Sequence, residues 1–167
     1  MYMKILVFSD SHSSLWFMRR CVSIIKPDGI IHLGDHAEDG SAIASENPSV
    51  PFYHVPGNCD SYYRSSSEAL TKICEIGGVK LLLTHGHRFQ VKSGIGKLLD
   101  HGRSAGVQAV LFGHTHTSLI QKEPDGLLAL NPGAAGSWGG SAGILEIRDK
   151  QIAACRIIEQ ADLDALV

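Results

Sequence analysis

The stretch Lys4-Ile5-Leu6-Val7-Phe8-Ser9-Asp10-Ser11-His12 decides the fold, because an apolar run leads directly into polar side chains. Residues 4–8 are predicted to form a buried strand, since their apolar character is continuous. Ser13 or Ser14 can cap a helix that follows, and Lys26-Pro27 ends it. A strand, a polar loop and a helix in this order predict the first unit of an α/β domain.

The alternation of strands and helices continues along the chain. Two short strands with a short helix between them are expected at residues 29–33, 37–46 and 52–55. An amphipathic helix is expected at residues 93–105. The remaining elements are expected to be strands, at residues 69–76, 79–84, 107–112, 118–122, 127–130, 142–147 and 151–158. This pattern predicts one mixed α/β domain over residues 1–167, and it allows two stacked sheets.

Composition limits the classes of function. The 167 residues, 44% of them hydrophobic, suffice to bury a core, and the formal net charge is −2. A general nucleic-acid or membrane-surface binder usually has a clear basic excess, so we expect neither function. No apolar segment is long enough for a signal peptide or a membrane span, and the four scattered cysteines form no CxxC pair. We therefore expect reduced thiols and a cytoplasmic location.

Polar side chains follow five of the predicted strands, at the point where each strand ends. They comprise two carboxylates, one amide and four histidines, namely Asp10, His12, Asp35, Asn58, His85, His114 and His116. In α/β sheets the ligand crevice lies at the carboxyl ends of the strands, so we expect these side chains to converge. Mixed nitrogen and oxygen ligands suit Zn, Mn, Fe, Co or Ni. Seven ligands are too many for one tetrahedral ion, and they fit two ions that share a carboxylate.

The motifs that carry these residues occur in the order known from one family. They are Asp10-Ser11-His12, Gly34-Asp35, Gly57-Asn58-Cys59-Asp60, His85-Gly86-His87 and Gly113-His114-Thr115-His116. With them the chain resembles the calcineurin-like metallophosphoesterases, and most closely the small bacterial and archaeal phosphodiesterases of the YfcE type. The resemblance runs from Lys4 to about Ile158. It implies an α/β fold in which a two-sheet mixed β-sandwich is flanked by helices.

The resemblance also implies a ligand set for each of two divalent metal ions. The first ion would be held by Asp10, His12, Asp35 and His116. The second would be held by Asp35, Asn58, His85 and His114, with Asp35 shared. We expect Mn, with Zn, Fe, Ni or Co as alternatives. A hydroxide bridging ions roughly 3.5–4 Å apart would attack phosphorus in line with the leaving oxygen.

One departure concerns the acid that protonates the leaving group. Larger members of this family carry His where this chain has Cys59. A thiol with a pKa of about 8.5 donates a proton less readily near neutral pH than an imidazolium does. Cys59 is therefore a weak candidate for contacts with the leaving group. His87 is a second weak candidate, which could contact the substrate phosphate or support His85. No residue is assigned as a general acid. Asp60 is expected either to orient a metal ligand or to cap a turn.

Several other residues are expected to have no direct role. His32 lies within an apolar strand and is predicted to be buried and hydrogen-bonded. His36 is expected to face solvent from a loop. Glu38 and Asp39 are expected to be solvated. Trp138, in a glycine-rich segment, is expected to pack over a sheet edge rather than to line a substrate cleft.

Three functions compete. The favoured one is a phosphodiesterase that hydrolyses a small phosphodiester. A phosphomonoesterase or protein phosphatase ranks lower, because the chain is short and lacks the family's His at the position of Cys59. The third is a non-catalytic scaffold, like the related retromer subunit, which has lost a metal-ligand histidine, whereas every expected ligand is present here. Small relatives commonly form dimers or higher assemblies, so a homo-oligomer stays open.

Overall fold

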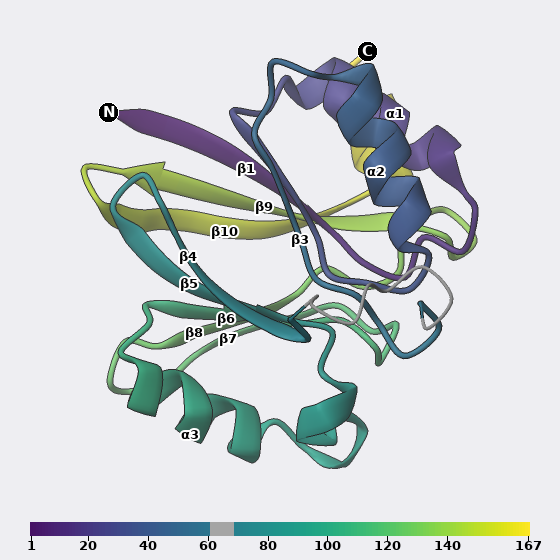
Figure 1. The fold of residues 1–167 in the computed structure, drawn as a ribbon. Helices are drawn as coiled ribbons and strands as arrows, with labels where there is room; N and C mark the ends of the chain where they lie inside the picture. The colour runs from purple at the N-terminus through teal and green to yellow at the C-terminus, as the bar shows by residue number, and fades with distance from the viewer. Residues whose placement is uncertain (61–68) are drawn as a thin grey trace.

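Two five-stranded mixed sheets stack face to face in the computed structural model, which describes residues 1–60 and 69–167 (Figure 1). The first sheet contains β1 (Tyr2–Phe8), β2 (Gly29–His32), β3 (Phe52–His54), β9 (Ser141–Arg148) and β10 (Gln151–Glu159), in the order β10-β9-β1-β2-β3. The second contains β4 (Thr71–Ile76), β5 (Val79–Thr84), β6 (Ala109–Leu111), β7 (Leu119–Lys122) and β8 (Leu128–Asn131), in the order β4-β5-β6-β8-β7. The expected two-sheet sandwich is confirmed.

The central strand β1 shows why its apolar run is continuous. Ile5 and Val7 point between the sheets and belong to the core that both sheets share. Leu6 and Phe8 point to the opposite face and pack against the helices there. On its two edges β1 pairs in parallel with β2 and antiparallel with β9. A strand buried on both faces needs apolar residues at every position.

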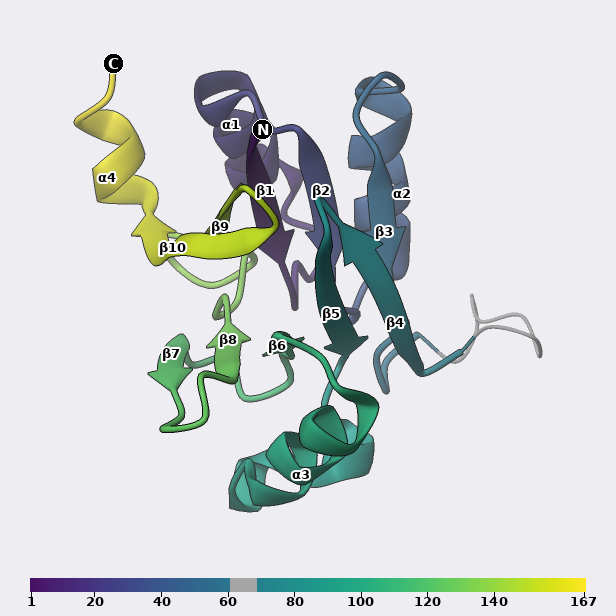
Figure 2. The same cartoon turned by 90° about the vertical axis from the view of Figure 1, so that its left-hand side faces the viewer.

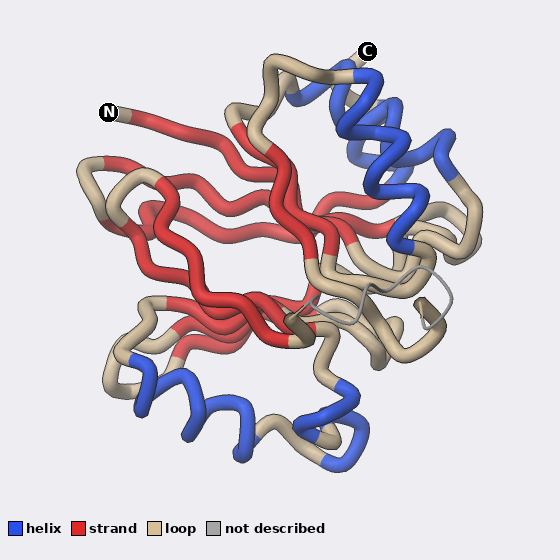
Figure 3. The backbone as a smooth tube through the Cα atoms, in the orientation of Figure 1, coloured by secondary structure: helices blue, strands red, loops and turns tan. Residues whose placement is uncertain are grey.

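Helices cover the outer face of each sheet (Figures 2 and 3). The first sheet is covered by α1 (Leu15–Ile25), α2 (Ala37–Glu46) and the short α4 (Gln160–Asp164). The second sheet is covered by α3 (Gly96–Ala105), which contributes Leu98 and Leu99 to a separate apolar cluster. Two 3₁₀ turns, η1 (His87–Phe89) and η2 (Val91–Ser93), connect β5 to α3.

A few element boundaries differ from the sequence-based expectation. The helix predicted at 93–105 begins only at Gly96, because residues 91–93 form a 3₁₀ turn. The helix α4 was not predicted, and its five residues are too few to show a helical period. Cys21 is buried, whereas Cys74 and Cys155 are only partly buried at the margin of the inter-sheet core.

The parallel strands position the polar loops. Strands β1, β2 and β3 run parallel in one sheet, and β5, β6 and β8 run parallel in the other. The loops after β1, β2, β5 and β6 therefore leave the sandwich at the same end, drawn in tan at the right of the strands in Figure 3. Within the described part of the chain, no helix has the length and apolar character needed to cross a membrane.

Candidate metal centre

The first predicted ligand group is assembled at this end of the sandwich. Asp10, His12, Asp35 and His116 each offer one ligand atom, and these four atoms lie within 4.8 Å of one another. His116 Nε2 lies 3.1 Å from Asp10 Oδ1 and 3.4 Å from His12 Nε2. Three loops that are far apart in sequence thus bring two carboxylates and two imidazoles to one point, as the strand order predicts.

The histidines of the second predicted group lie directly beside the first. His85 Nε2 is 3.4 Å from Asp35 Oδ2 and 3.8 Å from Asp10 Oδ1. The ring of His114 lies with its centroid 5.0 Å from that of His85. Asp35 therefore contacts members of both groups, which is the position required of a shared ligand.

The tautomer of His85 is fixed by the backbone directly after β2. Its Nδ1 lies 2.8 Å from the carbonyl oxygen of Leu33, which can only accept a hydrogen bond, so Nδ1 carries the proton. In the neutral ring the lone pair is then on Nε2, the atom that faces the carboxylates. A backbone carbonyl that orients a histidine in this way is a common feature of metal sites.

Two buried polar atoms at the centre of the cluster test whether a cation fits. Asp10 Oδ2 accepts hydrogen bonds from Ser9 Oγ (2.6 Å) and the His114 backbone N–H (3.1 Å), which leaves Oδ1 facing the histidines. Asp10 Oδ1 and His85 Nε2 are both buried and have no hydrogen-bond partner among the described residues. Buried polar atoms are nearly always paired. A carboxylate oxygen and an imidazole lone pair that converge without a proton donor fit a divalent metal ion.

The electrostatics of the cluster favour positive charge. Burial by itself would raise the pKa of Asp35, but attraction to His85, whose Nε2 lies 3.4 Å from Oδ2, and a hydrogen bond from the Cys59 backbone N–H, 2.9 Å from Oδ1, hold that pKa well below its usual range. Burial lowers the pKa of His85, yet the carboxylates of Asp35 and Asp10, 3.4 and 3.8 Å from its Nε2, raise that pKa overall. Without a metal, these carboxylates thus draw a proton toward the position that a cation would occupy.

Asp60 caps the turn after β3 and also binds the backbone of Asp35. The side chain is buried, and its carboxylate accepts hydrogen bonds from three backbone N–H groups, those of Gly57 (2.7 Å), Asp35 (2.8 Å) and Ala37 (2.9 Å). These bonds close the turn after β3 and hold the backbone of Asp35 in place. Asp60 is therefore a positioning residue for the carboxylate that both ligand groups contact.

The remaining predicted residues lie around this cluster. Asn58 is exposed, with its Nδ2 3.6 Å from Cys59 Sγ on the loop whose backbone binds Asp35. Partial burial and the nearby Asp35 carboxylate raise the pKa of the Cys59 thiol, which keeps it protonated at neutral pH. His87 is partly buried, and its ring centroid lies 5.6 Å from that of His85. The position of His87 suits a contact with substrate or with His85.

The backbone at these residues is unusual. Five of the seven predicted ligands have a positive φ, namely Asp10 (53°), His12 (46°), Asp35 (59°), His114 (68°) and His116 (60°). Non-glycine residues rarely adopt this conformation, and such strain concentrates at functional sites. The backbone also packs closely here. At Gly113 a Cβ methyl group would overlap Ser9 Oγ and lie 2.8 Å from Asp10 Oδ2, so only glycine fits.

Two expectations about neighbouring residues were wrong. Asp39 is buried rather than solvated, because its carboxylate accepts a hydrogen bond from the Ser13 backbone N–H at 2.7 Å and so holds the loop that carries His12. Trp138 is fully exposed and does not pack over a sheet edge. Ser9 was also missed as a residue that orients Asp10, although a serine at the end of an apolar run was the signal for it.

Partly buried residues beside Asp35 also depart from the expectation. His36 was expected to face solvent, but its ring centroid lies 5.0 Å from that of His12 and its Nδ1 lies 3.5 Å from Glu38 Oε1. Glu38 is likewise only partly exposed. Their side chains are still 32% and 40% exposed, so both residues face solvent in part, and His36 also lies against the cluster.

His32 is buried and hydrogen-bonded as predicted, which makes the fold sensitive to acid. Its Nε2 lies 3.0 Å from Ser11 Oγ, and its Nδ1 accepts from the Gly34 N–H at 3.2 Å. Burial lowers the pKa of His32 to about 4, while nearby carboxylates offset only part of that effect. The unfolded chain, with an ordinary pKa of about 6.5, therefore binds the proton first.

We expect the stability contributed by neutral His32 to be complete above pH about 6.5 and lost as the pH falls toward about 4, by about 3 kcal/mol. His32→Asn keeps an acceptor for the Gly34 N–H but cannot titrate. Urea unfolding of both metal-free proteins between pH 4 and 7 measures the difference. If the free energy of unfolding of the wild type falls in parallel with that of the variant, the assignment is wrong.

Comparison with known proteins identifies the class to which this fold and site belong. The family model described as the calcineurin-like phosphoesterase superfamily domain matches residues 3–150. The chain therefore belongs to the calcineurin-like phosphoesterase superfamily, as its five motifs predicted. Its family is one of metal-dependent phosphoester hydrolases, and the cluster described above provides the matching candidate metal site.

Individual relatives agree with this assignment. The probable metallophosphoesterase YsnB of Bacillus subtilis is 30% identical over 138 residues, which cover 79% of this chain and 75% of that protein. A phosphodiesterase of Methanocaldococcus jannaschii is 29% identical over 146 residues, covering 78% of this chain and 83% of that protein.

Solved structures share the fold. One described as a novel archaeal phosphodiesterase has a TM-score of 0.71 at 24% identity and covers 94% of this chain and 99% of its own. The vacuolar protein sorting 29 protein of Cryptosporidium parvum has a TM-score of 0.71 at 18% identity and covers 95% of this chain and 97% of its own. At these identities the likeness shows the architecture alone.

Proposed function

We propose that the chain is a phosphodiesterase that binds two divalent metal ions, preferably Mn, and hydrolyses a small phosphodiester. One observation carries the proposal: Asp10 Oδ1, Asp35 Oδ2 and His85 Nε2 converge in a buried position where no described group donates a proton to Asp10 Oδ1 or His85 Nε2. The phosphodiesterase among the relatives supports the diester as substrate. A cytoplasmic location is part of the proposal, and the four unpaired cysteines support it.

The ligand assignment follows from the two groups around Asp35. Asp10, His12 and His116 would hold one ion and Asn58, His85 and His114 the other, with Asp35 between them. The bound ions would supply an activated water and positive charge against the phosphoryl oxygens. The chain supplies the orientation: Ser9 and the backbone of Cys59 hold the two carboxylates, and the Leu33 carbonyl holds His85. Because these groups are fixed before substrate arrives, little reorganisation is needed during reaction.

The absence of a histidine at position 59 favours a diester with a good leaving group. The raised pKa of Cys59 makes this thiol a weak proton donor near neutral pH. A leaving group that must be protonated would therefore depart slowly, whereas one with a low pKa would not. This argument ranks phosphodiester hydrolysis above protein-phosphatase activity.

Asn58 as a neutral ligand would keep the site net positive. We expect Asn58→Asp to retain metal but to raise KM for a diester about tenfold, since one added negative charge beside the ions weakens the attraction of the anionic phosphoryl group by at least about 1–2 kcal/mol. Metal content and steady-state kinetics measure the two effects separately. Asn47→Asp, at the end of α2, is the matched control and should leave KM unchanged. Equal KM values in all three proteins would contradict the charge argument.

A paired assay tests the proposal. Bis-p-nitrophenyl phosphate and p-nitrophenyl phosphate are offered to the protein with Mn, and again after chelation. We expect hydrolysis of the diester that is lost on chelation and restored by Mn, with slower hydrolysis of the monoester. Faster hydrolysis of the monoester would favour the phosphomonoesterase. Inactivity on both, with tight binding of a protein partner, would favour the scaffold.

A further inference from the structure

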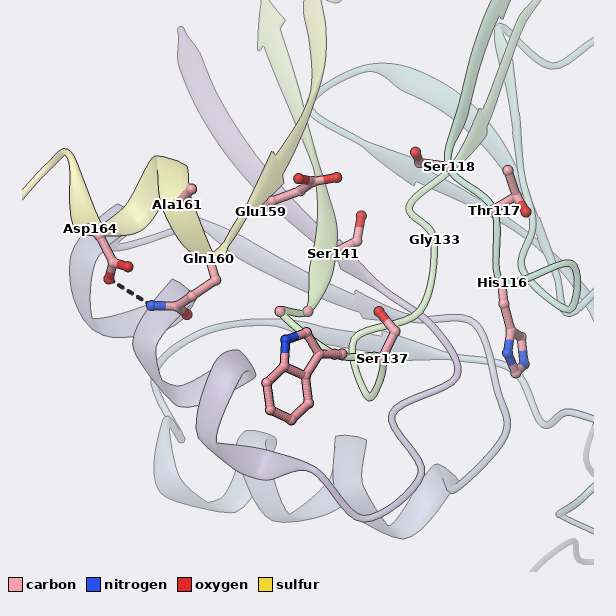
Figure 4. A pocket seen from close by; sticks show the side chains of 13 residues that line it. His116, Thr117, Ser118, Gly133, Ser137, Ser141, Glu159, Gln160, Ala161 and Asp164 are labelled. Carbon is pink, nitrogen blue, oxygen red and sulfur yellow. Dashed lines mark hydrogen bonds between the residues drawn. The ribbon is translucent and has the colours of Figure 1, made fainter.

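A pocket of about 540 Å³ opens beside the candidate metal centre (Figure 4). His116, a member of the metal-ligand cluster, lines one side of it. From there the pocket passes the glycine-rich loop that carries Trp138 and reaches Glu159 and Gln160 at the start of α4. A pocket of this size that shares a wall with the metal centre can hold the part of a substrate that extends from the phosphate.

The walls of the pocket are tied to the segment that carries Asp10. The backbone N–H of Gly136 donates to the Asp10 carbonyl at 3.1 Å, and Ser137 Oγ donates to the Ala134 carbonyl at 2.9 Å. On the other side the Gln160 N–H donates to the Gly139 carbonyl at 3.1 Å. The backbone of the Trp138 loop is therefore tied to both the segment of the metal ligands and α4, which places Trp138 at the rim of the pocket.

The charges in the pocket exclude a second phosphate. Its described lining includes the carboxylates of Glu159 and Asp164 and no Lys or Arg. Asp164 is already paired, with Arg20 Nη2 2.9 Å and Gln160 Nε2 2.6 Å from its Oδ1, whereas the Glu159 carboxylate takes part in the capping box of α4 and has no ion pair with any described residue. Such walls repel anions, and they offer acceptors to hydroxyl and amino groups.

The polar groups that are available match an uncharged ligand. Thr117, Ser118 and Ser137 are exposed along the pocket, and their hydroxyl oxygens can accept hydrogen bonds, while the hydroxyl of Ser118 can also donate one. Gln160 Oε1 is buried without a partner among the described residues. Trp138 adds an aromatic face with a relative exposure of 105%, on which a flat group can stack. Hydroxyl-rich walls beside an open indole are suited to a hydroxyl-bearing group with a flat face.

We propose that this pocket binds the non-phosphate part of the diester, an uncharged, hydroxyl-bearing group with a flat face such as a nucleoside or a sugar has, and that Trp138 stacks on it. The proposal rests on the proposed hydrolysis for the role of the ligand, but binding to the pocket can be measured without a metal. Trp138 is thereby a specificity-determining residue. The phosphate lies at the metal centre, and the group beyond it extends past His116 onto the indole.

The kinetic test compares two diesters in the Mn-loaded protein, the p-nitrophenyl ester of thymidine 5′-monophosphate and the smaller methyl p-nitrophenyl phosphate. We expect Trp138→Ala to raise KM for the thymidine ester about tenfold, the size of effect that loss of one aromatic stack produces. KM for the methyl ester should not change. Trp138→Phe, which keeps an aromatic face, should restore most of the affinity. Tyr2→Ala, an exposed aromatic residue at the opposite end of β1, is the control.

The binding test needs no catalysis. The chain has two tryptophans, so Trp138 is the sole indole in a Trp16→Phe protein. Thymidine and glucose are titrated into this metal-free protein while its fluorescence is recorded. Saturable quenching by thymidine alone identifies a nucleoside pocket, and quenching by glucose identifies a sugar pocket.

Defined results overturn the proposal. An unchanged ratio of the two KM values in Trp138→Ala, or no response of the fluorescence to either compound, means that the pocket does not bind the substrate. If the wild type hydrolyses neither diester, the proposed phosphodiesterase function is wrong, and the fluorescence titration alone then decides whether the pocket binds such a group.

Discussion

Asp35→Asn is expected to lower kcat/KM for a diester by at least about a thousandfold, because a shared metal ligand stabilises the transition state by several kcal/mol through both ions. Asp35 lies close to both predicted ligand groups. Its carboxylate is within 4.8 Å of the ligand atoms of Asp10, His12 and His116, and it is 3.4 Å from His85 Nε2. An amide keeps the shape of the side chain but removes the charge. The same change should also reduce the Mn bound at saturation.

Two measurements separate loss of metal from loss of fold. Circular dichroism and thermal unfolding of metal-free Asp35→Asn should resemble those of the wild type, since the variant loses a ligand and keeps an acceptor for the Cys59 N–H. Asp100→Asn, the same substitution on the exposed side of α3, should retain full activity and metal content. Full activity of Asp35→Asn with its metal retained would show that Asp35 is not a shared ligand.

Asp60→Asn is expected to weaken Mn binding by about 10- to 100-fold, although Asp60 is not a predicted ligand. The Asp60 carboxylate accepts from three backbone N–H groups, one of them that of Asp35. An amide would replace one acceptor oxygen by an NH₂ group, so at least one buried N–H would lose its partner. That loss should also cost about 1–3 kcal/mol in the free energy of unfolding.

Calorimetric titration of Mn and urea unfolding of the metal-free protein test these two effects. Asp28→Asn is a suitable control, because Asp28 accepts a backbone hydrogen bond from Lys4 at 2.8 Å but is exposed at the far end of the first sheet. A control that binds Mn normally and an Asp60→Asn protein that does not would establish the positioning role. Equal Mn affinity in both would rule it out.

The parts of the fold that depend on local pattern could be predicted from the sequence. The apolar run 4–8 is buried on both faces of β1, so its continuous apolar character was enough to predict a buried strand. The convergence of the ligand loops could also be predicted, from the geometry of parallel strands. The carboxyl ends of parallel strands meet at one edge, which let Asp10 and Asp35 be placed together without knowledge of the strand order.

Features that depend on contacts between distant segments could not be predicted. Asp39 lies beside Glu38 in the first turn of α2, and two adjacent acidic residues usually indicate a solvated turn. Its burial is explained by the hydrogen bond that it accepts from the Ser13 backbone N–H. The exposure of Trp138 depends on a loop that is pinned by hydrogen bonds to Asp10 and Gln160, over 20 residues away in either direction. Hydrophobic character alone predicts the opposite for a tryptophan.

Anomalous diffraction from crystals grown with Mn would show directly whether the loops after the strands enclose a pair of cations. Two peaks are expected on either side of the Asp35 carboxylate, one beside His12 and His116 and the other beside His85 and His114. A map with no peak at Asp35, or with a single ion held elsewhere, would contradict the two-metal centre.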